Sequence, residues 1–265
     1  MLSYQHAYHA GSFADVLKHV TLCLICDYMG QKEKPLFYLE THAGRGIYDL
    51  TSPMAQKTVE YKTGAGLFWK NKEKLPAVFS SWMDVIHKYN SDTLQFYPGS
   101  PLFALHRLRE QDRFNFCELH PGEFDFLKNL DNQHKSVQYL FKDGIAHMNA
   151  ALPPKEKRGL IFIDPSYELK QEYQFIPDKI MQSYKKFATG VYCLWYPILN
   201  QQENQAFIKN LRTSHVENQL NIEFLLDPQP QTGMIGTGLW VINPPHILQE
   251  QMDEVLATLK LYCHF

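Results

Sequence analysis

The stretch Leu160-Ile161-Phe162-Ile163-Asp164-Pro165-Ser166-Tyr167 places four apolar residues directly before an acidic residue, a proline and an aromatic residue. Four consecutive apolar residues of these types predict a strand that is buried on both faces of a parallel sheet. An aspartate at the end of such a strand costs free energy when it has no role. The same holds for the proline without an N–H group and the aromatic side chain that follow it, and we expect this aromatic side chain to be exposed. This segment therefore predicts a strand and a candidate site at its end.

Similar short strands are predicted on both sides of this segment. They span residues 36–41, 114–119, 137–141 and 191–197. The last four strands of this series are separated by intervals that each suit one crossover helix, which indicates an α/β fold with a mostly parallel, twisted sheet. Near the C-terminus, residues 222–227 and 239–243 predict two strands joined as an antiparallel hairpin across a segment rich in proline and glycine.

The connection between the first two strands is too long for one helix, because Thr41 and Phe114 are 73 positions apart. Residues 57–70 and 76–89 mix apolar and charged residues at helical intervals. We therefore expect an inserted helical subdomain at about residues 50–105 within a single domain of residues 1–265. Long insertions in open α/β sheets usually lie on the ligand side.

The composition is that of an ordinary globular protein, with 45% hydrophobic and 20% charged residues. The longest uncharged apolar run, residues 20–26, is far shorter than the roughly 18 residues of a membrane span. No basic segment leads into an apolar one at the N-terminus, so we expect a cytoplasmic location and no membrane partner. The odd number of cysteines, 5, favours reduced thiols over disulfides.

The net charge gives no overall attraction for nucleic acid, because the chain has 26 Lys and Arg residues and 28 Asp and Glu residues. A polyanionic partner would have to be held by a local patch. Each candidate patch, taken alone, is more often a solvated surface than a nucleic-acid-binding site. The candidates are Lys32 with Lys34, the run Lys155, Lys157 and Arg158, and Lys185 with Lys186.

Polar residues follow four of the predicted strands. The first strand runs into Thr41-His42-Ala43-Gly44-Arg45-Gly46, the second into Glu118, the third into Asp143-Gly144 and the fourth into Asp164. Each group alone could be a turn or a solvated residue. Ligands of open parallel sheets bind beyond the carboxyl ends of the strands, so the coincidence of four such groups favours one binding crevice.

Two further patterns could indicate a metal site, but both favour ordinary structure. Cys23 and Cys26 have the spacing of a metal or redox pair, yet they lie in an apolar helical run without a second pair. We expect them to be buried core thiols. The cluster His6, His9, His19 and His42 belongs to a chain with 12 histidines, so some coincidence is expected and no metal is predicted.

Motifs in a fixed order extend over nearly the whole chain. They are Met1-Leu2-Ser3-Tyr4-Gln5-His6, His9-Ala10-Gly11, Ala14-Asp15-Val16-Leu17-Lys18-His19, Thr41-His42-Ala43-Gly44, Tyr97-Pro98-Gly99-Ser100-Pro101, Arg109-Glu110-Gln111-Asp112, Glu118-Leu119-His120-Pro121, Arg158-Gly159-Leu160-Ile161, Phe187-Ala188-Thr189-Gly190, Leu194-Trp195-Tyr196-Pro197 and Val241-Ile242-Asn243-Pro244-Pro245. This ordered set resembles the RlmJ family of bacterial 23S ribosomal RNA adenine-N6 methyltransferases. Asp164-Pro165-Ser166-Tyr167 is similar to the Asp-Pro-Pro-Tyr signature of enzymes that methylate exocyclic amino nitrogens, with Ser166 in place of the second proline.

The resemblance implies a Rossmann-like class I methyltransferase fold, S-adenosylmethionine as cofactor and 23S ribosomal RNA, before its assembly into the subunit, as partner. Its cofactor-binding positions match His19, His42, Ser100, Glu118, Asp143, Gly144 and Asp164, and its substrate-closing segment matches Tyr4, His6 and Lys18. Asp164 also matches the catalytic position. We expect Asp164 and the carbonyl of Pro165 to accept the two N6 hydrogens of adenine, with Tyr167 stacked on the base. Because Ser166 replaces a proline, we expect the turn to be kept but to be less rigid.

Three alternatives remain open from the sequence. A DNA adenine-N6 methyltransferase would share the Asp164 motif, and composition does not separate RNA from DNA. A noncatalytic RNA-binding ribosome-assembly factor could retain the fold, a reading that Ser166 favours. A nicotinamide-dependent oxidoreductase is less favoured, because the loop at Gly44 and Gly46 lacks the third glycine of the dinucleotide-binding motif.

Overall fold

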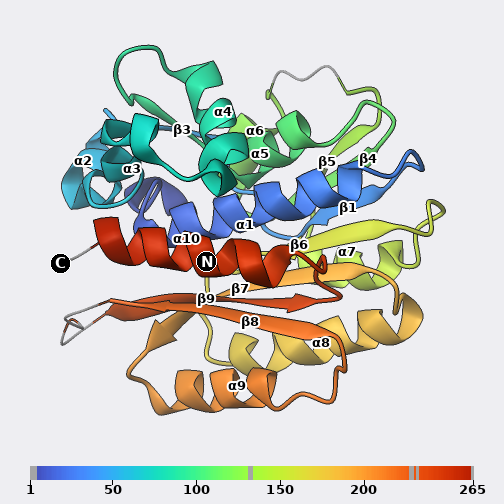
Figure 1. The fold of residues 1–265 in the computed structure, drawn as a ribbon. Coiled ribbons are helices and arrows are strands. Elements are labelled where there is room, and N and C mark those ends of the chain that lie inside the picture. Colours follow the sequence, from blue (N-terminus) through green and yellow to red (C-terminus); the bar gives the residue numbers. More distant parts are fainter. Residues whose placement is uncertain (1–4, 131–133, 227–229, 231–232, 264–265) are drawn as a thin grey trace.

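Figure 1 shows the fold in a computed structural model, which describes residues 5–130, 134–226, 230 and 233–263. Within these residues a seven-stranded sheet has the order β5-β4-β1-β6-β7-β9-β8. Its strands are β1 (Phe37–Glu40), β4 (Arg113–Glu118), β5 (Val137–Phe141), β6 (Gly159–Ile163), β7 (Val191–Leu199), β8 (Gln219–Leu225) and β9 (Met234–Ile242). The first five are parallel, and β9 pairs antiparallel with both β7 and β8. The α/β class, the mostly parallel sheet and the antiparallel C-terminal pair predicted from the sequence are confirmed.

Helices cover both faces of the sheet. One face is covered by α1 (Phe13–Gly30) and α10 (Leu248–Tyr262), with α4 (Ser80–Tyr89) and α5 (Ser100–Arg107) packed on α1. The other face is covered by α7 (Gly144–Ala151), α8 (Glu172–Lys186) and α9 (Gln202–Arg212). Side chains alternate along β6, so Leu160 and Phe162 enter the first layer while Ile161 and Ile163 enter the second. Both faces are therefore apolar, which explains why the strand reads as an unbroken hydrophobic run.

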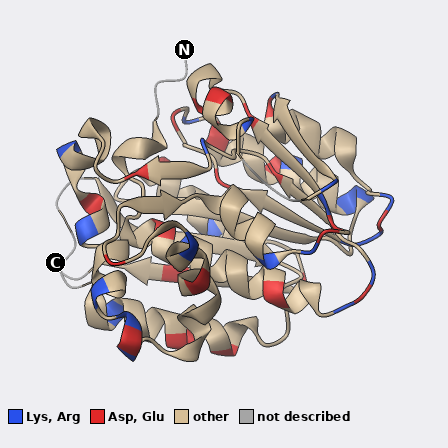
Figure 2. Cartoon of the chain, turned by 90° about the horizontal axis from the view of Figure 1, so that it is seen from above, with Lys and Arg blue, Asp and Glu red and all other residues tan. Residues whose placement is uncertain are grey.

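Charged residues lie mainly on loops and outer helix faces, and the central strands are nearly free of them (Figure 2).

A short helix, α6 (Pro121–Leu127), packs beside β4 and β5 at one side of the sheet. None of the helices in the described ranges combines the length and the apolarity that crossing a membrane would require.

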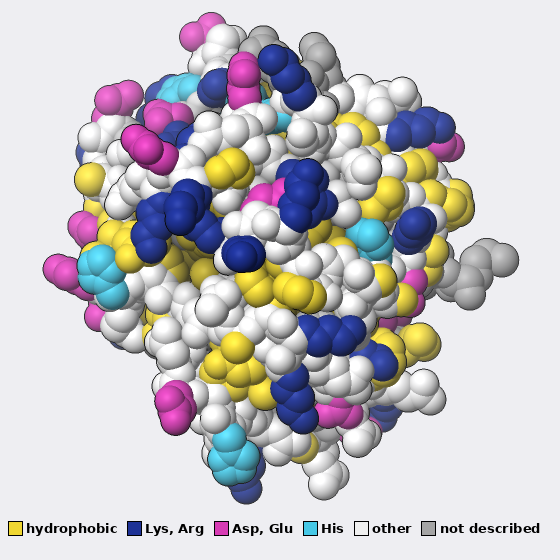
Figure 3. All heavy atoms as spheres, turned by 90° about the vertical axis from the view of Figure 1, so that its right-hand side faces the viewer, with side chains coloured by type: hydrophobic (Ala, Val, Ile, Leu, Met, Phe, Trp, Pro, Cys, Tyr) yellow, Lys and Arg dark blue, Asp and Glu magenta, His cyan; other side chains and the backbone are white. Residues whose placement is uncertain are grey.

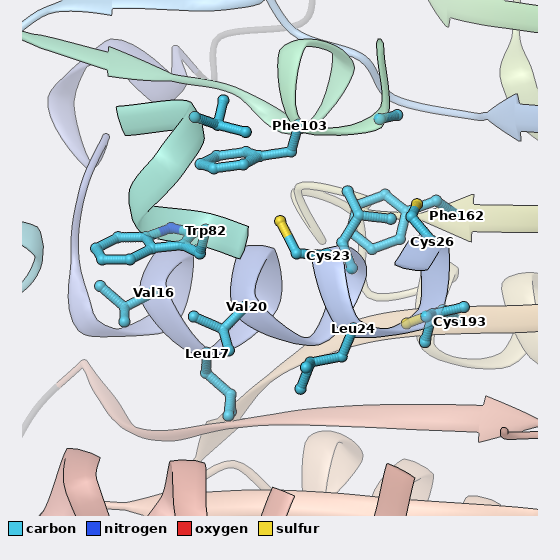
Figure 4. Close-up of a cluster of buried hydrophobic side chains, with 14 of the residues drawn as sticks. Val16, Leu17, Val20, Cys23, Leu24, Cys26, Trp82, Phe103, Phe162 and Cys193 are labelled. Atoms are coloured by element: carbon cyan, nitrogen blue, oxygen red, sulfur yellow. The ribbon is translucent and has the colours of Figure 1, made fainter. Parts of the chain in front are cut away.

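The first helix, α1, is buried on almost every side. It lies between the sheet and the helices α4, α5 and α10, and a helix in such a position has to be apolar all round. Figure 4 shows Cys23 and Cys26 on this helix among buried apolar side chains, which include Trp82, Phe103 and Phe162. All five cysteines are free and buried, and burial raises the pKa of the Cys23 and Cys26 thiols. The prediction that both are core thiols is confirmed.

The segment between β1 and β4 contains a two-stranded antiparallel ribbon, β2 (Ile47–Asp49) and β3 (Phe96–Pro98), and α5 follows β3. Between these strands lie α2 (Pro53–Thr58), α3 (Ala65–Lys70), α4 and short 3₁₀ turns at Glu60–Lys62, Lys72–Lys74 and Ala77–Phe79. A further 3₁₀ turn, His6–Tyr8, precedes α1. The sequence did not indicate the ribbon, because strands of three residues are too short to show a period of two.

At the amino ends of the parallel strands, Asp112 joins the turn before β4 to the turn before β1. Its carboxylate is fully buried and accepts the N–H groups of Leu36 and Arg109, each at 2.9 Å. It also forms an ion pair with the guanidinium of Arg109 at 3.0 Å. One buried acid thus satisfies two backbone donors from segments far apart in the sequence.

We predict that Asp112→Ala lowers the free energy of unfolding by about 3 kcal/mol, because the N–H of Leu36 would remain buried without its acceptor. Glu110→Ala removes a neighbouring exposed acid and should change the free energy by less than about 0.5 kcal/mol. Urea denaturation measures both values. Equal stabilities of the two variants would contradict the structural role of Asp112.

Candidate active site

The loops at the carboxyl ends of β1, β4, β5 and β6 meet around one cavity of about 740 Å³. Its lining includes every predicted site residue that the structure describes: His6, Lys18, His19, His42, Ser100, Glu118, Asp143, Gly144, Asp164, Pro165 and Tyr167. The predicted residue Tyr4 lies outside the described residues. Residues that are up to 161 positions apart in the sequence are therefore brought to one place by the parallel topology.

The glycine loop after β1 is anchored by Glu118. The N–H of Gly44 donates to one oxygen of this carboxylate at 2.8 Å, and the N–H of His120 donates to the other at 2.7 Å. Gly44 has a φ of 61°, and a Cβ there would lie 2.4 Å from the hydroxyl of Tyr48, so the loop requires glycine. Burial raises the pKa of Glu118 although these backbone donors oppose the rise. Glu118 therefore shapes the loop as well as lining the cavity.

Asp143 and Gly144 bring the start of α7 against the end of β1. One oxygen of Asp143 accepts the N–H groups of Ile145 and Ala146, at 2.9 and 3.0 Å, and so caps the helix. A Cβ on Gly144 would lie 1.9 Å from the carbonyl oxygen of Thr41. Only glycine permits this approach, which closes one wall of the cavity.

A chain of charged groups links α1 to the end of β6. The ammonium of Lys18 lies 2.6 Å from Asp164 and 2.9 Å from Asp15. Asp15 in turn contacts the imidazole of His6 at 2.9 Å and accepts the N–H of Gly11 at 2.8 Å. The side chains of Lys18 and Asp15 are only 4% and 1% exposed, so these charges depend on one another for stabilisation.

The two buried members of this chain are held in their charged forms. Burial disfavours both charges, but the carboxylates of Asp15 and Asp164 raise the pKa of Lys18 overall. In the same way, burial opposes ionisation of Asp15, yet the neighbouring His6 and Lys18 hold its pKa well below the usual range. The sequence analysis missed Asp15 as a site residue. Its spacing of three positions from Lys18 on a predicted helix was the available signal.

Two histidines that line the cavity, His19 and His42, are neutral side chains. Burial lowers the pKa of His42 to about 4 and also lowers the pKa of His19 well below its ordinary value. His19 hydrogen-bonds to the hydroxyl of Tyr97 at 2.8 Å, and His42 hydrogen-bonds to Thr41 at 2.8 Å. Among the described residues, no three His, Cys, Asp or Glu side chains are grouped so that they could hold a metal ion.

Ser100 is bound to a buried acid that the sequence analysis also missed. Its hydroxyl donates to Glu40, the last residue of β1, which accepts the hydroxyl of Tyr38 at 3.0 Å as well. Glu40 is fully buried, and burial raises its pKa to about 8. Nothing in the sequence distinguishes this acid from a solvated residue at a strand end, because its burial depends on packing by the helix that carries Ser100.

The aromatic ring of Tyr167 turns inward, so the expectation of an exposed side chain is wrong. Tyr167 is 9% exposed, and its ring stacks on Tyr173 of α8 with a centroid distance of 4.8 Å. The hydroxyl of Tyr167 donates to the carbonyl oxygen of Trp195 at 3.0 Å. A φ of 52° at Tyr167 turns the chain at this position, and the ring packs against α8 and β7 while it still lines the cavity.

The cavity is strongly acidic. Among the described residues, its lining contains one lysine, Lys18, which is already paired. The acidic lining residues are Asp15, Glu60, Glu118, Glu123, Asp143, Asp164, Glu168 and Glu172. Such a lining suits a ligand that carries a positive charge or donates hydrogen bonds, and it disfavours a phosphate group.

Comparisons of the sequence identify one family, and a comparison of structures finds a protein with the same fold. Residues 33–262 match the family model described as "Ribosomal RNA large subunit methyltransferase D, RlmJ". Ribosomal RNA large subunit methyltransferase J of Haemophilus influenzae is 44% identical over 98% of this chain and 93% of its own length. The protein of the same name from Escherichia coli is 42% identical over the same shares of the two chains. A crystal structure of a Legionella pneumophila protein is 48% identical, with a TM-score of 0.90 over 96% of this chain and 94% of that one.

The buried acid Glu40 predicts a pH dependence of stability. Its pKa of about 8 exceeds its ordinary value of 4.5, so the folded protein keeps a proton that the unfolded chain releases between these values. The resulting stabilisation is complete below about pH 4.5 and is lost as the pH rises through about 8. His42, with its lowered pKa, contributes the opposite slope, but only below its ordinary pKa of 6.5.

We therefore predict that the free energy of unfolding falls by up to about 2 kcal/mol between about pH 6.5 and 8. Glu40→Gln, which cannot lose a proton, should reduce this fall. Glu217→Gln, at an exposed position, should leave it unchanged. Urea denaturation at a series of pH values measures the slopes, and the same slope in all three proteins would contradict the role given to Glu40.

Proposed function

The chain belongs to the RlmJ family of ribosomal RNA large subunit methyltransferases, and on this premise we propose that it methylates the N6 amino group of an adenine in 23S ribosomal RNA. The methyl donor is S-adenosylmethionine. The observation that carries the proposal is the position of Asp164 and Pro165 at the end of β6, where they line the same cavity as Glu118 and Asp143.

The residues of the cavity fit S-adenosylmethionine. When bound, this molecule supplies a methyl group on a positively charged sulfonium. The acidic lining favours such a charge, and the neutral imidazoles of His19 and His42 do not oppose it. We assign binding of this donor to His19, His42, Ser100, Glu118, Asp143, Gly144 and Asp164. Glu118 suits the ribose hydroxyls, because a carboxylate accepts two hydrogen bonds side by side.

Asp164 and Pro165 orient the target nitrogen. The lone pair of adenine N6 is delocalised into the ring, which makes this nitrogen a poor nucleophile. The carboxylate of Asp164 and the backbone carbonyl of Pro165 accept its two hydrogens and turn the lone pair toward the donor. Tyr167, whose ring stacks on Tyr173, contributes to the cavity wall against which the base lies.

Lys18 holds the carboxylate of Asp164 in place for this role. Its ammonium contacts Oδ2 of Asp164, which leaves Oδ1 for an N6 hydrogen of the base. After methyl transfer the nitrogen is cationic, and its proton passes to Asp164 and onward through water or His6. Asp15 acts as a positioning residue, because it holds both Lys18 and His6. We assign contacts with the target nucleotide to Tyr4, His6 and Lys18.

The target base has to leave its stack to reach this cavity. Extrusion costs a few kcal/mol in a duplex and less in unpaired RNA. Protein-free 23S ribosomal RNA is therefore the more accessible substrate, and we place methylation in the cytoplasm before the RNA is assembled into the subunit. The same cost favours a loop or a weakly paired adenine as the target.

We predict that Asp164→Asn slows methyl transfer at least about 100-fold, because the amide lacks the charge that stabilises the developing cation. The measurement is incorporation of label from methyl-labelled S-adenosylmethionine into a protein-free 23S transcript, followed by mapping of the modified base. Affinity for the donor should change by less than about tenfold. Asp178→Asn, at an exposed position on α8, serves as the matched control and should keep the wild-type rate.

Three outcomes would overturn these assignments. Wild-type turnover in Asp164→Asn would remove this residue from the mechanism. Label that is found on DNA and resists alkali, with none on RNA, would assign the enzyme to DNA adenine methylation instead. Absence of transfer from the wild-type protein to total bacterial RNA would favour a noncatalytic RNA-binding factor.

For the donor site, we predict that Glu118→Ala weakens S-adenosylmethionine binding by about 10- to 100-fold, since both a charged acceptor and the anchor of the Gly44 loop are lost. Titration calorimetry measures the affinity. Glu217→Ala, at an exposed position far along the chain, provides the control. An unchanged affinity in Glu118→Ala would exclude this residue from the binding site.

A further inference from the structure

The turns that precede β4, β1, β6 and β7 form a continuous surface at the amino ends of these strands. The four strands are neighbours in the sheet, so their turns lie side by side at the edge opposite the cavity. The segments 108–113, 31–36, 152–158 and 185–190 contain nine Lys and Arg residues and four Asp and Glu residues, in a chain whose net charge is −2. We call these four segments the basal surface. Figure 3 views this end of the molecule, and Lys and Arg side chains predominate across its centre.

Two guanidinium groups are held together in the middle of the basal surface. Arg109 donates to the carbonyl oxygens of Lys32 and Lys34, at 2.5 and 3.1 Å. Arg158 donates to the same carbonyl of Lys34 and, at 2.6 Å, to that of Met29. Burial and the adjacent charge of Arg109 lower the pKa of Arg158. Asp112 balances the charge of Arg109, whereas carbonyl groups bind Arg158 without cancelling its charge, so Arg158 keeps a positive centre here.

Two of the four acids of the basal surface neutralise guanidinium groups, and the other two, Glu33 and Glu110, are exposed. Asp112 is buried against Arg109, and Glu156 is paired with Arg113 at 2.9 Å with 7% of its side chain exposed. Within the described part of the chain, the exposed lysines of the basal surface form no ion pair. They are Lys32, Lys34, Lys155, Lys157, Lys185 and Lys186. Lys157 also adopts a φ of 57°, a conformation in which glycine is favoured over lysine.

The cavity cannot supply the attraction that an RNA backbone needs. Its acidic lining repels phosphates, and its single lysine is occupied by two carboxylates. The affinity of proteins for nucleic acid comes largely from cations that displace counterions from phosphates. Exposed lysines for which no ion pair is found among the described residues, adjacent to the guanidinium of Arg158, have the chemistry for this role.

We propose that the basal surface binds the sugar–phosphate backbone of a second segment of the RNA whose adenine enters the cavity. This inference rests on the proposed function, and it adds a site on the opposite edge of the sheet. The contact is to phosphates and therefore independent of base sequence. A long RNA engages both edges at once, whereas a short fragment that carries only the target adenine engages the cavity alone.

The test uses two variants that lose equal charge. The first replaces Lys32, Lys34, Lys155 and Lys157 with Gln. The control replaces Lys62, Lys74, Lys209 and Lys260 with Gln, all exposed residues outside the basal surface. Binding to the 23S transcript is measured against salt concentration, and methylation kinetics are measured on the transcript and on a short fragment around the mapped adenine. Thermal unfolding checks that both variants fold.

The basal variant should bind the transcript with a salt slope reduced by about 3, since each lost phosphate contact removes about 0.7 to 0.9. Its KM for the transcript should rise at least about tenfold, with kcat unchanged. On the short fragment its kinetics should match those of the wild type. The control variant should resemble the wild type on both RNAs.

Equal behaviour of the basal and control variants on the transcript would overturn the inference, as would an equal loss on the short fragment. Failure of the wild-type protein to methylate either RNA would instead refute the proposed function. If the fourfold variant is unstable, the double variants Lys32→Gln with Lys34→Gln, and Lys155→Gln with Lys157→Gln, permit the same comparison.

Discussion

The ion pair between Lys18 and Asp164 is the contact on which the site depends. Two charges that are nearly excluded from water lose several kcal/mol of hydration each, and they persist only when each supplies the other with a partner. Here Lys18 lies between Asp164 and Asp15, and Asp15 also holds His6. The 3₁₀ turn at the N-terminus, the first helix and the end of β6 are thereby fixed relative to one another. A residue that precedes the whole sheet in sequence therefore forms an ion pair with the acid at the end of β6.

Much of the fold could be predicted because its pattern is local. The apolar run at residues 160–163 and the polar residues that follow it identify β6 without any tertiary information. β9 was predicted too short, as residues 239–243 instead of Met234–Ile242. Gly236 was assigned to the connecting turn and Gly238 lay outside the predicted strand, whereas a Cβ on Gly238 would lie 2.4 Å from the ring of Tyr196. Glycine is needed there so that an aromatic side chain of β7 can lie against the strand, a contact that no sequence period reveals.

The site residues at the strand ends were predictable for the same reason, since parallel topology alone brings Glu118, Asp143 and Asp164 to one edge. What the sequence did not show is what each buried acid binds. Glu40 accepts hydroxyl groups from its own strand and from α5, and Asp15 neutralises a lysine that also serves β6. The inward turn of Tyr167 likewise depends on Tyr173. These roles arise from tertiary partners, and an isolated acid or tyrosine in a sequence carries no record of its partner.

The proposed enzyme binds a cationic methyl donor and an anionic RNA, and this explains why acids and cations lie at opposite edges of the sheet. A sulfonium and an amino group that becomes cationic call for acidic neighbours, yet acids at the same place repel the phosphates of the RNA that delivers the amino group. The conflict is reduced when the cations lie elsewhere. Five residues of parallel strand span about 17 Å, which is longer than the screening distance of about 8 Å at physiological ionic strength. The basal surface can therefore attract RNA without weakening the field at Asp164, and the acidic cavity can hold its cationic donor without repelling RNA bound at the opposite edge.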